Sequence, residues 1–146
     1  MTRIAVVDGQ GASIGSAIIK KIKQVYGDTA DVWALGTNAI ATTQMMKAGA
    51  NRGATGESAV CHCVHQVDVV IGSISILVSN SLMGELTPSM ALAIGSSKAP
   101  KLLLPITQEN VIVVSTTFEP LPHLIERLIS EQLAPFVGGK EFTRHK

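Results

Sequence analysis

A glycine-rich loop near the start of the chain has the residue types and spacing of an anion-binding site. Residues 4–7 are Ile, Ala, Val and Val, which suit a strand buried on both faces, and a predicted amphipathic helix begins at residue 13. Glycine lets the chain turn tightly after a strand. The free N–H groups and the dipole of a helix N-terminus attract negative charge. The candidate phosphate-binding residues are Asp8, Gly9, Gln10, Gly11, Ser13 and Gly15.

Polar residues also follow the next two predicted strands. Gly36, Thr37 and Asn38 come after a strand at residues 30–35, and Ser73 follows a strand at residues 68–72. Ligands of open α/β sheets bind beyond the carboxyl ends of the strands, so we expect these residues to converge with the first loop. The pattern predicts binding of a nucleotide or another phosphorylated small molecule. The alternative is that Asp8 and Asn38 only satisfy loop amides and cap helices.

The glycine pattern differs from the standard dinucleotide fingerprint. Gly9, Gly11 and Gly15 give G-x-G-x-x-x-G, and Ile14 stands where G-x-G-x-x-G has its third glycine. Residues 36–38 also lack the acidic residue that usually binds the ribose hydroxyls. Because the fingerprint is incomplete, a small NAD(P)-dependent oxidoreductase is the alternative function rather than the main one. The cofactor is unknown.

The carboxylate of Asp8 is a difficulty for a phosphate site, because the two groups repel each other. A bound Mg²⁺ could bridge Asp8 and the phosphate. Alternatively, Asp8 could turn away from the ligand and hold the loop, which is the arrangement we favour.

A second cluster of candidate residues follows the second helix. Arg52 lies in a predicted loop between helices, where it could grip a phosphate or carboxylate, or form a surface or subunit-interface ion pair. Asn80 and Glu85 flank a predicted helix end and could reach the same cleft, although Glu85 is interpreted as a solvated turn residue rather than as an acid catalyst. The further candidate ligand-binding residues are Arg52, Thr55, Glu57 and Asn80.

The remaining polar patterns predict neither a metal site nor a catalytic set. Cys61, His62, Cys63 and His65 are residue types that bind zinc, but Cys63 falls on the apolar side of its predicted helix. The four side chains therefore cannot close on one tetrahedral ion. No G-x-x-x-x-G-K-[ST] motif occurs, and Tyr26 has no lysine four residues later. Whether the chain is an enzyme is left open.

The order of the predicted elements indicates one α/β domain over residues 1–146. Strands are predicted at residues 4–7, 30–35, 68–72, 101–106 and 111–115, and helices at residues 13–26, 39–48, 55–66, 73–83, 88–94 and after 120. We expect a three-layer, doubly wound (Rossmann-like), mostly parallel sheet of about five strands with the first strand central. The loop before residue 111 is too short for a crossover, so the last strand is expected to be antiparallel at an edge. Residues 51–54 are predicted as a loop and residues 140–146 as a frayed tail.

The composition favours a protein that associates with copies of itself. Apolar residues make up 46% of the chain and charged residues only 16%, below the roughly 25% usual in globular proteins. We therefore expect a homodimer or larger homo-oligomer.

Charge and residue usage also predict the surroundings of the protein. A net charge of +1 and few aromatic residues argue against nucleic acid. The most apolar stretch, residues 69–83, is interrupted by polar residues and is shorter than the ~20 residues of a membrane span. No secretory signal is visible, and Cys61 and Cys63 are poorly spaced for a disulfide, so a cytoplasmic location is expected.

Four blocks of the sequence carry a resemblance to a known family. The blocks are residues 8–11 with 14–15; 34–38 with 40–42; 47–50 with 52–57; and 80–81, 84–85, 87–88, 90–91 and 93–97. In these blocks the chain resembles a small bacterial family with a Rossmann-like fold that is described only as a domain of unknown function. The resemblance covers most of residues 3–106 and implies the fold but no activity. The third hypothesis for the function is a non-enzymatic, oligomeric protein with a structural or interaction role.

Overall fold

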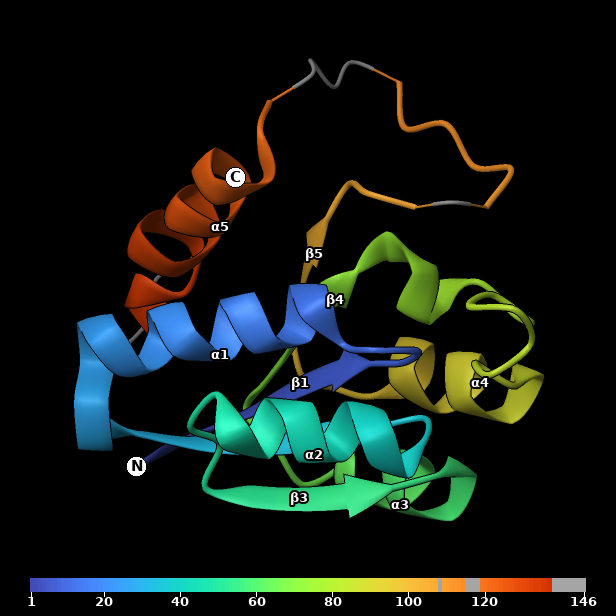
Figure 1. The fold of residues 1–146 in the computed structure, drawn as a ribbon, viewed down its shortest axis with the longest axis horizontal. Helices are drawn as coiled ribbons and strands as arrows, with labels where there is room; N and C mark the ends of the chain where they lie inside the picture. Colours follow the sequence, from blue (N-terminus) through green and yellow to red (C-terminus); the bar gives the residue numbers. More distant parts are fainter. Residues whose placement is uncertain (108, 115–118, 138–146) are drawn as a thin grey trace.

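The five strands of the described residues lie parallel in one sheet (Figure 1). The computed structural model describes residues 1–107, 109–114 and 119–137. The strands are β1 (Thr2–Asp8), β2 (Ala30–Gly36), β3 (Arg52–Thr55), β4 (Val69–Ser73) and β5 (Lys101–Leu104), in the order β3-β2-β1-β4-β5. β1 is central, as predicted, and pairs with β2 on one side and β4 on the other. The direction of winding therefore reverses between β1 and β4, which is the switch point of the sheet.

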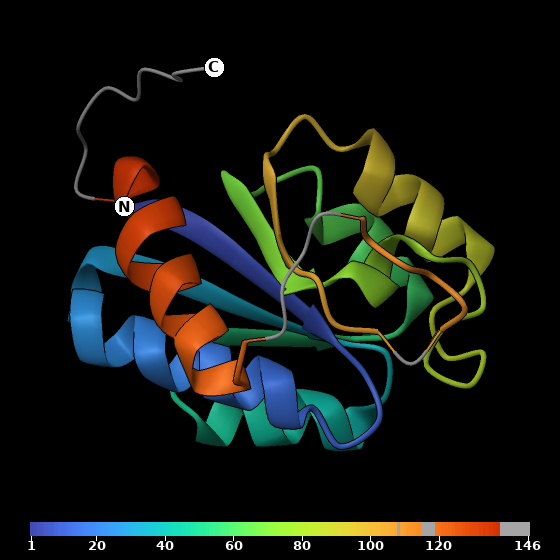
Figure 2. The ribbon, with the colours of Figure 1, turned by 90° about the horizontal axis from the view of Figure 1, so that it is seen from above.

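Helices cover both faces of the sheet (Figures 1 and 2). One face carries α1 (Ser13–Tyr26), α2 (Ala39–Lys47) and α5 (Leu121–Arg127), which continues into a π-helical turn at Leu128–Gln132. The other face carries α3 (Glu57–Cys63), α4 (Pro88–Ser96) and a 3₁₀ turn at Ile74–Leu77. Further 3₁₀ turns are Gly27–Thr29 and Ala134–Phe136.

The central strand shows why two hydrophobic cores form. Successive residues of a strand point to opposite faces. Ile4 and Val6 of β1 accordingly belong to the core under α1, whereas Ala5 and Val7 belong to the core under α4. All four side chains are buried, so the apolar run predicts the strand correctly. The predicted α/β class is confirmed.

Local signals place several helix ends where they were predicted. Thr87 Oγ1 accepts the N–H of Met90 at 3.2 Å and Pro88 occupies the first position of α4, as in a standard N-cap. Asn38 Oδ1 accepts the N–H of Ala41 at 2.8 Å and caps α2. α1 ends at Tyr26, and the next residue, Gly27, has a φ of 53°, which glycine adopts without steric penalty. No helix among the described residues combines the length and the apolarity that crossing a membrane requires.

The predicted antiparallel strand is wrong. β5 runs parallel to β4, with Val70 opposite Lys101, and the crossover between them contains α4. Residues 111–114 form no strand, and Ser115 lies outside the described residues. Ile112 and Val114 are 87% and 84% exposed, so this apolar run does not enter the core.

The fifth strand is β3, at residues that were predicted as a loop. Its sequence, RGAT, has no apolar alternation, because the strand lies at the edge of the sheet and three of its four residues are exposed. It pairs only with β2, from Trp33 opposite Arg52 to Gly36 opposite Thr55. Edge strands need little apolar surface, and a search for buried runs therefore misses them.

Two helix predictions are corrected as well. Thr55 ends β3 rather than capping a helix, and α3 begins at Glu57 after Gly56, whose φ is 96°. The helix predicted at residues 73–83 is limited to the short 3₁₀ turn. Leu82 and Met83 both have φ of 55°, which an α-helix does not accommodate. The predicted tail at residues 140–146 lies outside the described residues.

Candidate functional site

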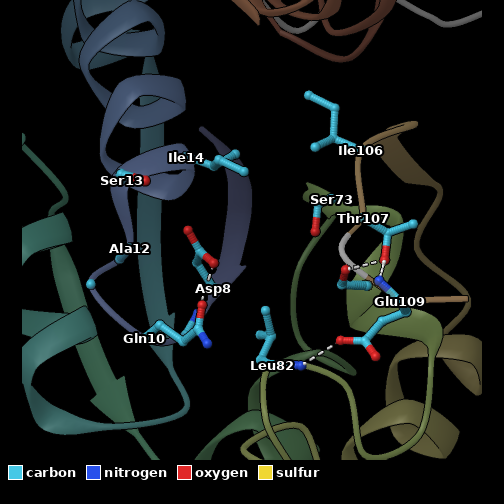
Figure 3. A pocket seen from close by; sticks show the side chains of 13 residues that line it. Asp8, Gln10, Ala12, Ser13, Ile14, Ser73, Leu82, Ile106, Thr107 and Glu109 are labelled. Atoms are coloured by element: carbon cyan, nitrogen blue, oxygen red, sulfur yellow. Dashed lines mark hydrogen bonds between the residues drawn. The ribbon is translucent and has the colours of Figure 1, made fainter.

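An open cavity of about 140 Å³, here called the loop cavity, lies at the carboxyl ends of β1, β4 and β5. One wall comes from the loop after β1 and the first turn of α1, and the other from the segments after β4 and β5 (Figure 3). The cavity is lined by residues 8–14 and by Ser73, Ser75, Leu82, Ile106, Thr107 and Glu109. It therefore occupies the switch point of the sheet, where α/β proteins bind ligands.

The backbone of the loop after β1 is tightly wound. Gln10 and Ala12 both have positive φ, at 51° and 53°, and the N–H of Ala12 donates to Gly9 O at 2.8 Å. Such conformations are uncommon outside glycine and cost of the order of 1 kcal/mol or more each. A Cβ at Gly9 would lie 2.9 Å from Glu85 Oε1 and even closer to Thr37 Oγ1. A side chain at residue 9 would therefore force Thr37 and Glu85 to move from these positions.

Asp8 holds both ends of this loop. Its Oδ1 accepts the N–H of Gly9 at 2.8 Å, and its Oδ2 accepts the N–H of Gly15, in the first turn of α1, at 2.7 Å. Burial raises the pKa of Asp8 above its ordinary value. The two amide hydrogen bonds oppose this shift, and the charge of Glu85 adds to it. Asp8 thus holds the loop, as in the favoured arrangement, but it also lines the cavity and does not turn away from a ligand there.

Glu85 is the hydrogen-bonding hub behind the loop. Its Oε1 accepts the Gln10 N–H at 2.8 Å, the Thr37 hydroxyl at 2.6 Å and the Asn38 Nδ2 group at 2.8 Å. Burial alone would raise the pKa of Glu85, but the hydrogen bonds from Thr37, Gln10 and Asn38 outweigh it and lower the pKa. One carboxylate thus ties together the loops that follow β1 and β2.

Three backbone amides of the cavity wall are unused. The N–H groups of Gly11, Ser13 and Ile14 have no acceptor among the described residues, whereas those of Gly9, Gln10, Ala12 and Gly15 all have one. Ser13 and Ile14 begin α1, so the amides there have no partner within the helix. The N-terminus of a 14-residue helix therefore presents free donors to the cavity.

The opposite wall of the cavity is polar, and some of its polar groups are hydrogen-bonded to other residues of the protein. Ser75 Oγ donates to Thr107 Oγ1 at 2.8 Å, and Glu109 Oε1 accepts the N–H of Leu82 at 3.1 Å. Ser73 lines the cavity without a hydrogen bond from its hydroxyl to any described residue. No lysine or arginine lines the cavity among the described residues. An anion held here would therefore depend on amides and hydroxyls.

The structure brings together only some of the residues predicted from the sequence. The loop cavity is lined by Asp8, Gly9, Gln10, Gly11, Ser13 and Ser73. Thr37 and Asn38 lie behind it and bond to Glu85, and Gly15 bonds to Asp8. Asn38 Nδ2 also donates to Gln10 O at 3.1 Å, so the side chain that caps α2 also braces the loop.

The other predicted residues make contacts outside the lining of the cavity. A Cβ at Gly36 would clash with the Thr42 amide. Thr55 Oγ1 shares a hydrogen bond of 2.7 Å with Thr42, and Glu57 accepts the Thr87 hydroxyl at 2.6 Å. The Asn80 N–H donates to Leu86 O at 2.7 Å within a turn. Arg52 begins β3, and therefore lies at the amino end of that strand.

Sequence reasoning missed several residues of the cavity and one motif. Ser75, Leu82, Ile106, Thr107 and Glu109 line the cavity from segments without a recognisable pattern. Residues 11–15 also read G-x-S-x-G, the pattern of a hydrolase nucleophile elbow. In that elbow the serine occupies the strained turn, but here the left-handed residue is Ala12. No histidine lines the cavity in the described part of the chain, so Ser13 lacks the histidine partner of that elbow.

The cysteine and histidine residues of α3 do not form a cluster. Both cysteines are free thiols, Cys61 Sγ donates to Ser89 O at 3.5 Å, and His62 contacts Gln66 at 2.7 Å. Burial raises the pKa of both thiols. Within residues 1–107, 109–114 and 119–137, no group of three or more potential metal ligands lies close together.

Comparison with known proteins places the chain in a family whose function is unknown. Residues 3–136 match the family described as Domain of unknown function (DUF3842). No curated protein matches the chain.

Proposed function

Since the chain belongs to the DUF3842 family, whose function is unknown, we propose a function from the site itself. The loop cavity binds the phosphate of a nucleotide or another small phosphorylated molecule. The observation that carries this proposal is the set of unused N–H groups at Gly11, Ser13 and Ile14 in the cavity wall. Amides at a helix N-terminus bind phosphate through hydrogen bonds and through the helix dipole.

The position of Asp8 is compatible with an anionic ligand. Both of its carboxylate oxygens accept loop amides, so its negative charge is already stabilised by the protein. Burial raises the pKa of Asp8, and protonation of this carboxyl would remove its repulsion of phosphate. We therefore expect Asp8 to act as a positioning residue that holds the loop, and we expect tighter phosphate binding at lower pH.

The size of the cavity favours a small ligand. Its volume of about 140 Å³ is below the roughly 300–1,000 Å³ usual for drug-sized ligands, so it suits a phosphate and the atoms next to it. The rest of a nucleotide would lie outside, beside Gln10 or Ser73. A complete NAD(P) site is less well supported, because Ile14 replaces the third glycine and Asn38 is occupied by Glu85 and Gln10.

A titration followed by ¹H–¹⁵N NMR tests the proposal. Inorganic phosphate, AMP, ATP, NAD and a sugar phosphate are added in turn, and the amide peaks of Gly11, Ser13 and Ile14 are followed. We expect saturable shifts of these three peaks with at least one phosphorylated compound. A specific response to NAD that is absent with AMP would instead favour the oxidoreductase hypothesis.

A pair of glycine variants provides the control. A Cβ meets nothing within 4 Å at Gly11 or at Gly95 in α4, so both positions have open space for the first atom of a side chain. Gly11→Val adds bulk at the cavity wall and is expected to abolish binding, whereas Gly95→Val is expected to leave it unchanged. Equal binding by the two variants, or shifts confined to another part of the chain, would refute the proposal.

We also propose that the protein acts as a homo-oligomer in a reducing compartment such as the cytoplasm. Large apolar side chains on three separate elements support association, since Ile40, Met83 and Leu92 are 68%, 91% and 71% exposed. The two free thiols support a reducing compartment. Light scattering tests the assembly, and a mass of one 15.3 kDa chain at micromolar concentration would refute it. If no phosphorylated compound binds but the chain is oligomeric, a structural or interaction role is favoured.

A further inference from the structure

A second cavity of about 280 Å³ lies between strands β2 and β3 and helix α3, and we propose that it binds a small carboxylic acid with an apolar body. Trp33, Arg52 and Cys63 are among its lining residues. None of its lining residues lines the loop cavity. The two proposed sites are therefore independent and can succeed or fail separately.

Arg52 supplies the group that would recognise a carboxylate. Its side chain is 69% exposed, and its guanidinium makes no hydrogen bond to any described residue. The nearest carboxylate oxygen, on Asp31, is 3.9 Å from Arg52 Nε, too far for a hydrogen bond. A guanidinium with unused donors binds a carboxylate through two parallel hydrogen bonds.

Trp33 fixes the position of that guanidinium. The Arg52 Cζ atom lies 5.7 Å from the centre of the Trp33 ring, and Arg3 lies over the same ring at 5.5 Å. Stacking on an aromatic ring restricts the arginine side chain and leaves the edge of its planar head available. Less entropy is therefore lost when a ligand binds to Arg52.

The rest of the cavity suits an apolar group. Trp33, Leu35, Ala54 and Cys63 contribute its mainly apolar lining. The indole N–H of Trp33 is buried and has no acceptor among the described residues, which is rare in folded proteins. An aromatic or branched aliphatic acid combines an apolar body with the carboxylate that Arg52 would bind.

Benzoate is the probe for this site, and NMR is the readout. Trp33 is the only tryptophan of the chain, so the ¹H–¹⁵N spectrum contains one indole peak, and that peak reports on this cavity. We expect benzoate to shift the indole peak saturably, with a Kd of the order of 1 mM. Benzamide has the same shape without the charge and is expected to bind at least about tenfold more weakly.

Variants of Arg52 separate recognition from simple charge. Arg52→Gln is expected to weaken benzoate binding at least about tenfold, and Arg52→Lys to weaken it nearly as much, because lysine cannot form the bidentate pair. Lys20→Gln makes the same charge change on α1, on the other face of the sheet, and should not alter binding. Absence of a saturable shift, or equal binding by wild type and Arg52→Gln, would overturn the inference. Retained binding by Arg52→Lys alone would also contradict the bidentate geometry.

Discussion

Replacing Glu85, which lies behind the loop cavity, by alanine should strongly destabilise the fold. The variant removes three hydrogen bonds that converge on Oε1, from the Gln10 amide, the Thr37 hydroxyl and the Asn38 side chain. A hydrogen bond to a charged group contributes about 1.5–3 kcal/mol. The three donors share one oxygen, and removing Glu85 also relieves its repulsion of Asp8. We therefore expect the free energy of unfolding to fall by about 2–4 kcal/mol, which is less than the sum of three separate hydrogen bonds.

Urea unfolding measured by circular dichroism provides the assay. With an m-value of about 2 kcal/mol/M, the midpoint should fall by about 1–2 M. Glu109→Ala is the matched control, because it removes a single hydrogen bond of 3.1 Å to the Leu82 amide and should lower the free energy of unfolding by about 1 kcal/mol. Glu85→Gln keeps an acceptor oxygen without the charge, so its loss of stability should lie between those of Glu109→Ala and Glu85→Ala.

The hub role of Glu85 would be refuted if Glu85→Ala lost no more stability than Glu109→Ala. The pH dependence gives an independent check. Because the pKa of Glu85 is lowered in the folded state, its stabilisation is complete above the ordinary value of 4.5 and is lost as the pH falls through the folded-state pKa. The difference in unfolding free energy between wild type and Glu85→Gln should therefore shrink on acidification. A difference that stayed constant down to the acid range would contradict this account.

Four further substitutions probe other contacts of the structure by urea unfolding. Gly9→Ala should destabilise by at least about 2 kcal/mol, because its Cβ would collide with Thr37 and Glu85, whereas Gly11→Ala has open space and should be neutral or slightly stabilising. The raised pKa of Asp8 works in the opposite direction to that of Glu85. Wild type should gain stability relative to Asp8→Asn as the pH falls through the raised pKa toward 3.8, and the reverse trend would contradict the assignment. Trp33→Phe removes a buried N–H without an acceptor and should cost less than about 1 kcal/mol; a loss above 3 kcal/mol would show that the indole N–H is satisfied in solution.

The parts of the fold that could be predicted are those fixed by neighbours in the sequence. The run at residues 4–7 predicts a buried central strand, and Thr87 with Pro88 predicts the start of α4. Both signals depend on contacts within a few residues. The turn after β1 belongs to the same class, since its glycines and its polar residues are adjacent in the chain.

The parts that could not be predicted depend on contacts between distant residues. Glu85 reaches the Gln10 amide across 75 positions, and nothing around Glu85 distinguishes it from a solvated turn residue. β3 was missed because an edge strand needs no apolar pattern. Ile112 and Val114 suggested a strand through their β-branched side chains, yet they stay outside the core. Local propensity is overridden wherever the sheet offers no partner.

The all-parallel strand order also determines when the loop cavity can form during folding. The strands β1, β2 and β3 are contiguous in the chain up to residue 55, so their pairing needs no later segment. β1 cannot pair with β4 until residues 69–71 are present, and the second wall of the cavity extends to Glu109. Pairing between distant strands is slow compared with local structure formation. A chain still emerging from the ribosome would therefore lack the complete cavity until Glu109 is present, and a molecule that binds the cavity would stabilise only chains in which both walls have formed.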